Sequence, residues 1–483
     1  MRAGKLIPGL MAAAVCMVAA CSGGGMPSGD STPSGDSAAA PPAQRTLAAT
    51  ATSGPGTYPA AAWPEFNQNE ARTGIASGLP PAGPLSEQWT ADLDGAVYGQ
   101  PLVVGDDVIA ATENDSVYAL NASTGAVVWH TRVGTPVPLS SLPCGDIDPL
   151  GITGTPVYDQ DNGLVYAVAE TSGFHHVLFG LSVRDGSVKV ERDIPAPDGN
   201  PRNDQQRPGL AIGAGRVYVA FGGLAGDCDQ YIGSVVGIPL SGGGPLVSWH
   251  TPTSREGAVW GTAGPVTGPD GDLWVSVGNG AAGAGQPYDG SDSVTRLTTG
   301  LVRKSFFAPA VWADDNATDQ DLGSTQPVLA AGNSTFIMGK RGVGYLLDAD
   351  DLGGIGHQLA EQAICGAFGA AAVSGPVVYE PCSDGGMAAI SVSAAQRNIS
   401  VLWRGPADSE GSPVVGGGAV WVTHYDSGGS SSGNTLYELD PATGAIRHQL
   451  AIPEGLPHFS SLSLAGGTAF LGTLDGVVAV SGA

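Results

Sequence analysis

The chain has 483 residues, of which 75 are glycine and 36 proline, and 42% are hydrophobic, so it is rich in turns and still able to form a core. Its 45 acidic and 20 basic residues give a net charge of −25, which would repel a phosphate backbone and excludes nucleic acid as an expected partner. Because no helical periodicity continues beyond the first segment, we expect one large all-β domain.

The N-terminus has the pattern of an export signal. A positively charged start and an apolar stretch lead to Val18-Ala19-Ala20-Cys21, which resembles the lipobox of bacterial lipoproteins. The resemblance implies a signal peptide over 1–20 and a lipid on Cys21. Residues 21–62, rich in Gly, Ser, Pro and Ala, would then form a flexible tether. We expect a protein on the extracytoplasmic face of the cell membrane, held by its lipid anchor only; the alternative is an ordinary secretory signal with an incidental cysteine.

A sequence phrase recurs along the rest of the chain. Residues 116–129 read SVYALNASTGAVVW, and residues 435–450 read TLYELDPATGAIRHQL. Each predicts a strand, a turn in which Gly125 or Gly444 supplies the positive φ angle, and a second strand. Weaker copies begin near residues 177, 234, 293, 343, 387 and 476. Eight copies at intervals of roughly 40 to 60 residues indicate a repeat architecture.

A further strand pair is expected before each phrase. Residues 100–112 (QPLVVGDDVIAAT) are the clearest example, and similar pairs are expected at 155–170, 209–221, 264–277, 326–338, 370–379, 412–423 and 460–471. Each unit therefore has four strands, which suits a propeller blade.

The last unit lacks a fourth strand, and a spare strand lies at the other end of the domain. Residues 85–93 (LSEQWTADL) contain Trp89 and precede the first full unit. We predict an all-β, eight-bladed β-propeller over 63–483, closed by this N-terminal strand, which completes the last blade and removes exposed sheet edges. The alternative, a sandwich of unrelated hairpins, suits eight equivalent units poorly.

Four cysteines remain once the two N-terminal ones are set aside. An even number outside the cytoplasm suggests two disulfides. In a propeller, the loops between blades lie on the same face as the loops that join the second and third strands of a blade. Cys144 and Cys365 fall in loops of the first kind, and Cys228 and Cys382 in loops of the second. We predict the pairs Cys144–Cys228 and Cys365–Cys382.

The Asp/Asn-x-x-Thr-Gly-x-x-x-Trp phrase, complete at 121–129 and partial at 440–444, resembles the tryptophan-docking repeat of pyrroloquinoline-quinone (PQQ) propellers. The resemblance extends from about Trp63 to the C-terminus and implies the propeller fold. Members of that family include quinoprotein alcohol dehydrogenases, and also non-enzymatic lipoproteins such as the scaffold of the outer-membrane barrel-assembly machinery.

Two stretches are more similar to the dehydrogenases. Residues 338–348 (MGKRGVGYLLD) resemble the enzymes' Lys-Asn-Gly-x-x-Tyr-x-Leu-Asp motif, which implies that Lys340, with Arg341 beside it, contacts the quinone. Gly278-Asn279-Gly280 resembles the strand end that binds calcium in the enzymes, which implies Asn279 as a Ca²⁺ ligand. The enzymes' carboxylate base would lie between the two stretches, where both Asp319 and Asp321 are candidates.

The sequence also departs from the enzymes. No two cysteines are neighbours, no Cys-x-x-Cys-His haem motif occurs, and the calcium-binding Glu has no marked counterpart, with Glu113 and Glu170 as unmarked candidates. Each enzyme-like stretch has a plain structural interpretation as well. Lys340-Arg341 suits an exposed hairpin, Asn279-Gly280 suits a turn, and the Asp-rich run suits a loop that caps backbone amides.

We therefore predict a membrane-tethered propeller that acts as a binding or scaffold protein for an unidentified protein or small molecule. Recognition is expected on the face that carries the long loops 222–233, 278–292 and 423–434. Its expected rim or pocket residues are 145–148, 202–207, Lys340, Arg341, His424, Tyr425 and His458. This role requires no cofactor. The alternative is an alcohol or sugar dehydrogenase that depends on PQQ and Ca²⁺ and passes electrons to a separate carrier, and enzymatic activity stays open at this point.

Overall fold

The computed structural model describes residues 63–482 except 82, 197–198, 384 and 426–432. The predicted signal peptide, Cys21 and the tether lie outside these residues, as does the middle of the predicted loop 423–434. In the described part, no helix has both the length and the apolar character needed to cross a bilayer.

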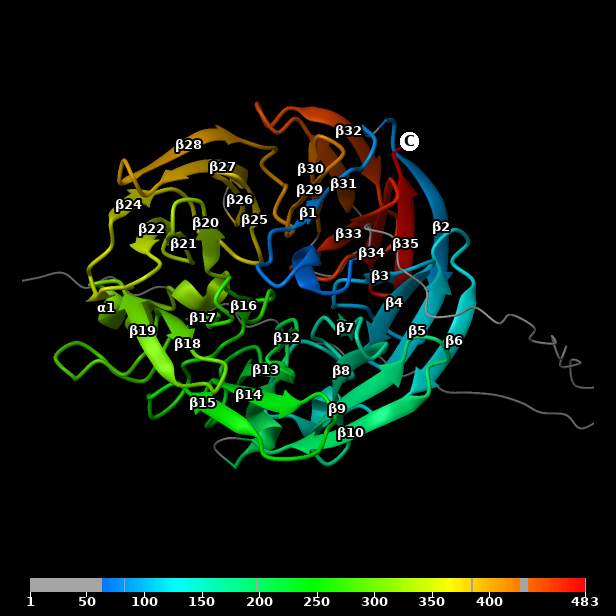
Figure 1. Ribbon diagram of the computed structural model, residues 1–483, viewed down its shortest axis with the longest axis horizontal. Coiled ribbons are helices and arrows are strands. Elements are labelled where there is room, and N and C mark those ends of the chain that lie inside the picture. Colours follow the sequence, from blue (N-terminus) through cyan, green and yellow to red (C-terminus); the bar gives the residue numbers. More distant parts are fainter. Residues whose placement is uncertain (1–62, 82, 197–198, 384, 426–432, 483) are drawn as a thin grey trace, which may run out of the picture. The chain divides into compact units, whose positions relative to one another are not determined.

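Eight sheets are arranged around a common axis, and each has four strands that follow one another from the axis outward (Figure 1). The first four blades consist of β3 (Leu102–Val104), β4 (Asp107–Thr112), β5 (Ser116–Asn121) and β6 (Val127–Arg132); β7 (Val157–Asp159), β8 (Leu164–Thr171), β9 (His175–Ser182) and β10 (Val188–Ile194); β12 (Ala211–Gly213), β13 (Arg216–Gly223), β14 (Ser234–Pro239) and β15 (Val247–His250); and β16 (Val266–Thr267), β17 (Leu273–Val277), β18 (Ser293–Leu297) and β19 (Arg303–Ala308).

The other four blades complete the ring. They consist of β20 (Val328–Ala330), β21 (Ser334–Ile337), β22 (Val343–Asp348) and β24 (Ala360–Ala363); β25 (Ala372–Ser374), β26 (Val377–Cys382), β27 (Gly386–Ser393) and β28 (Asn398–Arg404); β29 (Val414–Gly416), β30 (Ala419–His424), β31 (Thr435–Leu439) and β32 (Ile446–Ala451); and β33 (Leu462–Ala465), β34 (Thr468–Gly472), β35 (Gly476–Ser481) and β2 (Ser86–Asp92). The predicted eight-bladed, four-stranded propeller is thereby confirmed.

Short elements decorate this ring. They are β1 (Ile75–Ala76) beside β29, β11 (Asp204–Gln205) beside β13, β23 (Gly354–Ile355) beside β19, the 3₁₀ turns Phe66–Gln68, Leu139–Ser141, Pro201–Asn203 and Leu322–Ser324, and one short helix, α1 (Trp312–Thr318). After β22 the chain first forms β23, which pairs with β19 of the preceding blade, and then returns as β24, which pairs with β22. The short turn expected in the weak copy that begins near residue 343 is therefore a long connection.

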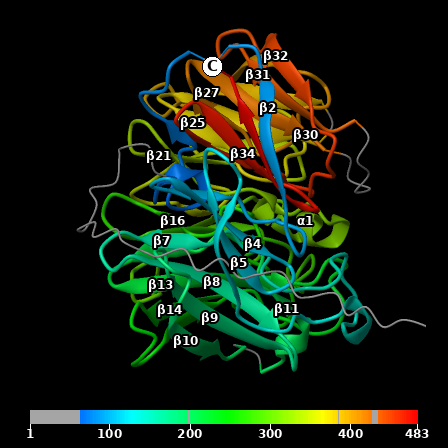
Figure 2. The same cartoon turned by 90° about the vertical axis from the view of Figure 1, so that its right-hand side faces the viewer.

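The ring closes as the sequence predicts. β2 pairs antiparallel with β35, and Trp89 lies opposite Ala479. Figure 2 shows this N-terminal strand, in blue, beside the red C-terminal strands. All the buried side chains of β35 join the same apolar cluster as Trp89 and Phe470 of β34, so β2 and the C-terminal strand are fixed together in one blade.

Tryptophans of outermost strands link neighbouring blades. The Nε1–H groups of Trp89, Trp129 and Trp403 donate to the carbonyl oxygens of Ala122, Val183 and Pro441, at 2.9, 2.8 and 2.9 Å, and each acceptor lies in the turn of the next blade. The Trp89 ring packs on that turn so closely that a Cβ at Gly125 would be 2.6 Å from it. The glycine of the repeated phrase is therefore required both by its positive φ of 69° and by this contact.

The segment that precedes β2 runs across the inner strands. Trp63 exchanges backbone hydrogen bonds with Val103 of β3, and the fully buried Arg72 donates to Glu65 and to the carbonyl of Leu210. β1 then pairs with β29, the innermost strand of the seventh blade. Residues 63–76 thus act as an internal plug that ties inner strands of different blades together.

Both predicted disulfides are present. Cys144–Cys228 and Cys365–Cys382 have Cα–Cα distances of 6.1 and 5.6 Å. The topological rule that placed all four cysteines on one face of the propeller is thereby confirmed.

Candidate functional site

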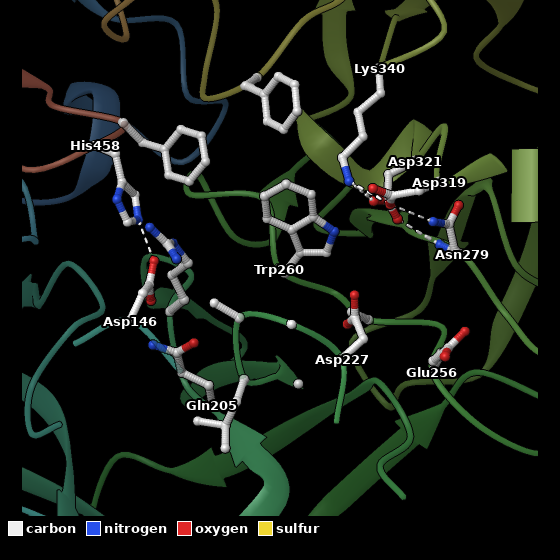
Figure 3. Close-up of a pocket in the computed structure, with 18 of the residues that line it drawn as sticks. Asp146, Gln205, Asp227, Glu256, Trp260, Asn279, Asp319, Asp321, Lys340 and His458 are labelled. Atoms are coloured by element: carbon white, nitrogen blue, oxygen red, sulfur yellow. Dashed lines mark hydrogen bonds and ion pairs between the residues drawn. The ribbon is translucent and has the colours of Figure 1, made fainter. Parts of the chain in front are cut away.

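A pocket of about 740 Å³ lies among the loops that join second to third strands and one blade to the next. Figure 3 shows side chains from many blades converging on it. Its two ends differ in chemistry. We call the group Asn279, Asp319, Asp321 and Lys340 the carboxylate end, and the group Gln205, Arg207, Tyr425 and His458 the donor end. Tyr98 lies behind the donor end, against His458.

Lys340 is the centre of the carboxylate end. Its Nζ lies 2.7 Å from Asp319 Oδ1 and 2.6 Å from Asp321 Oδ2. Asn279 donates from its backbone N–H to Asp321 Oδ1 at 2.7 Å and from Nδ2 to Asp319 Oδ1 at 2.9 Å. The structure therefore brings four of the residues singled out from the sequence into one hydrogen-bonded group.

Each of these residues sits where a regular element ends. Asn279 follows β17, and Lys340 lies in the turn between β21 and β22. Asp319 caps α1 in the left-handed region, with φ of 55°, and this reversal directs Asp321 back toward the axis. The short helix therefore places the carboxylates of Asp319 and Asp321 beside Lys340.

Arg341 does not line the pocket. Its guanidinium turns the other way and pairs with Asp314 and Asp315 at the start of α1, where the Asp314 contact is 2.5 Å. Arg341 thus holds the start of the segment 314–321, and its neighbour Lys340 holds the end. The structure assigns Arg341 a place in fixing α1 and gives it no pocket-facing position.

Burial sets the electrostatics of this end. It raises the pKa of Asp321, and the charge of Lys340 opposes that rise. Burial also acts to lower the pKa of Lys340, but the carboxylates of Asp321 and Asp319 outweigh it, so the pKa is raised and the ammonium form is held. The Asp321 side chain is 10% exposed and that of Asp319 is 71% exposed, so only Asp321 feels the protein interior.

Three aromatic rings cover the middle of the pocket. Lys340 Nζ lies 5.6 Å from the centroid of Trp260 and 5.5 Å from that of Phe368, within the range of cation–π attraction. Phe459 lies 6.1 Å from both rings and is nearly parallel to Phe368. The sequence reasoning missed all three, since they lie in loops between blades and outside the repeated phrase.

The donor end is built around Arg207, which lies with its Cζ 4.6 Å above Phe459. His458 packs edge-on against Tyr98 and approaches Asp146 at 3.7 Å. Burial, together with the charge of Arg207, lowers the pKa of His458 to about 4, so the imidazole is neutral at pH 7.

Other carboxylates divide between the pocket and the interior. Asp227 and Glu256 line the pocket, whereas Glu113 and Glu170 do not. Burial raises the pKa of Glu256; Arg255 opposes this, and the charges of Asp227 and Asp321 raise the pKa further, so these three carboxylates sense one another. Within the described residues, no group of three or more His, Cys, Asp or Glu side chains is arranged to hold a metal ion.

Comparison with known proteins gives two kinds of relative. A family model described as outer membrane protein assembly factor BamB matches residues 86–274. A polyvinylalcohol dehydrogenase of a Sphingopyxis species is 27% identical over an alignment 278 residues long. The alignment covers 49% of this chain and 36% of that enzyme, so the match spans about a third of the enzyme's length. The predicted resemblance to PQQ propeller repeats is confirmed.

Solved structures agree on the fold. A quinohemoprotein alcohol dehydrogenase of Pseudomonas putida superposes with a TM-score of 0.67 at 12% identity, covering 87% of this chain and 80% of the other. BamB of Moraxella catarrhalis gives 0.55 at 15% identity, covering 82% and 97%. A europium-containing methanol dehydrogenase gives 0.64 at 15% identity, covering 85% and 89%. Dehydrogenases and an assembly factor thus share this propeller.

Proposed function

We propose that the protein is a dehydrogenase that binds PQQ in the central pocket and oxidises an alcohol. The observation that carries this proposal is the convergence of Lys340, Asp321 and Asn279 beside Trp260 in a single pocket. A surface used only for docking has no need to desolvate a lysine and an aspartate together. The 27% identity to a polyvinylalcohol dehydrogenase supports the same reaction class.

The residues present fit a quinone. Trp260 offers an aromatic face beneath the Lys340 ammonium, and Asn279 Oδ1 is buried without a hydrogen-bond partner among the described residues. Trp260 would stack on the ring system, and Lys340 would face a quinone oxygen. When bound, PQQ supplies the acceptor for two electrons and for the hydrogen on the alcohol carbon.

Asp321 is the better of the two candidate bases. A general base works best when its pKa lies near the working pH, and burial raises the pKa of Asp321 toward that range. Asp321 Oδ2 would take the hydroxyl proton, and Lys340 would balance the charge that the carboxylate carries before the transfer. The exposed Asp319 would hold Lys340 in place.

Calcium fits by ligand type but not by arrangement. Oxygens of Asn279, Asp319 and Asp321 are hard donors, yet both carboxylates are paired to Lys340 in the position where a cation would sit. We therefore assign no step to a metal ion.

Cofactor addition tests the proposal. PQQ, added with and without Ca²⁺, should raise the melting temperature and quench tryptophan fluorescence, because a ligand that binds only the native state stabilises it. The variants Lys340→Ala and Trp260→Leu should lose both effects, and the exposed Lys189→Ala should keep them. Dye reduction with polyvinyl alcohol and with small secondary alcohols then measures turnover. Absence of any shift at excess PQQ refutes the proposal.

The second candidate is a binding or scaffold protein that recognises its partner through the long-loop face. One observation favours it: Lys340 is already satisfied by two carboxylates, so the pocket needs no ligand at that end. The family model over residues 86–274 is named for an assembly factor. Capture of a defined partner that survives Lys340→Ala, without PQQ binding, would support this candidate.

A further inference from the structure

Arg207 is the unexplained charge of the pocket. Among the described residues, its guanidinium makes no hydrogen bond and no ion pair, and its one specific contact is the stack on Phe459. The acidic group with the largest influence on the pKa of Arg207 is Asp146, which approaches His458 at 3.7 Å. Every other cation that lines the pocket is paired, because Lys340 holds two carboxylates.

The surroundings of Arg207 add hydrogen-bond donors beside the Asp146 carboxylate, which approaches His458. The side-chain amide of Gln205 has no hydrogen-bond partner among the described residues and lines the same pocket. Burial raises the pKa of Tyr98 and of Tyr425 to about 12, so both phenols keep their protons. His458 is neutral and adds no positive charge of its own.

An enclosed guanidinium without partners lacks both hydrogen-bond acceptors and a counter-charge. It carries five N–H donors in a fixed plane, and the low dielectric of a pocket makes an unpaired charge costly. Burial disfavours the charged form of Arg207 as well, because it lowers the pKa of the guanidinium. A folded protein keeps such a group when an anion from outside completes it.

The geometry selects the type of anion. One arginine fork matches a planar, singly charged carboxylate, whereas a phosphate carries more charge than a single guanidinium balances. The pocket also contains the carboxylates of Asp146, Asp227 and Glu256, which would repel a dianion. We infer that the donor end is a subsite for the carboxylate of an organic ligand, held by Arg207 with Gln205.

The inference extends to the class of substrate. In the proposed reaction the hydroxyl group lies at the carboxylate end, and the carboxylate of the same molecule would reach Arg207 across the aromatic middle of the pocket. The substrate is then a hydroxycarboxylate. The hydroxyl part of this assignment rests on the proposed function, whereas the carboxylate part does not.

Calorimetric titration without PQQ tests the carboxylate subsite. Gluconate and its neutral counterpart glucitol are the probes. Wild type should bind gluconate at least tenfold more tightly than glucitol. Arg207→Met should remove this preference, and Arg207→Lys should keep part of it. Arg303→Met is the matched control, because Arg303 also stacks on a phenylalanine, 5.0 Å from Phe306, but lies outside the pocket.

Three results would overturn the inference: equal binding of the two probes, gluconate binding that is unchanged in Arg207→Met, or displacement of gluconate by equimolar sulfate. A fourth result would also overturn it: PQQ binding that depends on Arg207, together with no binding of gluconate. The carboxylate held by Arg207 would then belong to the cofactor. Arg207-dependent gluconate binding without any PQQ binding keeps the inference and refutes the proposed function.

Discussion

The two ends of the pocket solve the problem of buried charge in opposite ways. At the carboxylate end, the ammonium of Lys340 is paired with Asp319 and Asp321 at 2.7 and 2.6 Å, so the charges are balanced within the protein. At the donor end, Arg207 has an aromatic ring beneath it and no ion-pair partner among the described residues. One end is complete without a ligand, and the other requires one.

This difference separates stability from recognition. A balanced ion pair contributes to the folded state whether or not a ligand is present, and removing one partner leaves a charge without compensation. An unpaired guanidinium costs free energy until an anion arrives, so its benefit is seen in binding. Substitutions at the two ends should therefore differ in which measurement they change.

The largest expected effect concerns the disulfides, since each braces one end. Cys144–Cys228 closes 84 residues beside the donor end, and Cys365–Cys382 closes 17 residues beside the carboxylate end. Loop entropy predicts that replacing the first pair with serine costs about 4–5 kcal/mol of unfolding free energy and replacing the second about 3 kcal/mol. Denaturant titration measures both. Equal losses, or a larger loss at the shorter loop, would contradict the loop argument.

A substitution at the carboxylate end should come next. Lys340→Met removes the counter-charge of the buried Asp321, and we expect a loss of about 2–4 kcal/mol in the free energy of unfolding. The double variant Lys340→Met/Asp321→Asn should recover most of this loss, because no charge is then left unpaired. If the single variant is as stable as wild type, the pair is not the stabilising element described above.

A feature of this protein could be predicted from the sequence when the residues that form it are close together in the chain. The repeated phrase contains its own turn and its own docking glycine, so the blades, the closing strand with Trp89 and both disulfides could be predicted. Asn279 and Lys340 could be placed in one site because each lies in a recognisable motif, and Asp319 and Asp321 because they lie between the two motifs. The choice between Asp319 and Asp321 depends on burial, which spacing does not reveal.

The donor end has no motif of its own: residues 202–207, Tyr425 and His458 were expected at the pocket only because they lie in loops of that face. Arg207 lies near the middle of the sequence and Phe459 near its C-terminal end, and the ring of blades brings them together. Trp260 lies in a loop between blades, where no periodicity marks it. Arg341 was grouped with Lys340 because the two are adjacent, but neighbouring residues of a tight turn point in different directions, and its partners are on α1.

Two buried carboxyl groups near the donor end should give a smaller change, a dependence of the free energy of unfolding on pH. Burial raises the pKa of Glu113 and of Asp115 to about 8. Between about pH 4.5 and pH 8 the folded state therefore holds protons that the unfolded state has released, so stability should fall as the pH rises through this range.

The variant Glu113→Gln should flatten this dependence. We expect the unfolding free energy of wild type to fall by about 1–3 kcal/mol between pH 5 and pH 8, and the variant to lose less, because its amide does not titrate. The exposed Lys189→Ala serves as the control and should keep the slope. A wild-type stability that rises over this interval would contradict the assignment.

The smallest effect on stability is expected for Arg207→Met. The variant loses the cation–π contact with Phe459 and also loses the cost of an unpaired, enclosed charge, so the two changes oppose each other and unfolding should shift by no more than about 1 kcal/mol. Gluconate then separates the proteins. At a concentration one hundred times its dissociation constant, it should stabilise wild type by about 2.7 kcal/mol and the variant by much less. If Arg207→Met instead unfolds as readily as Lys340→Met, then Arg207 has a structural partner, and the contrast between the two ends of the pocket fails.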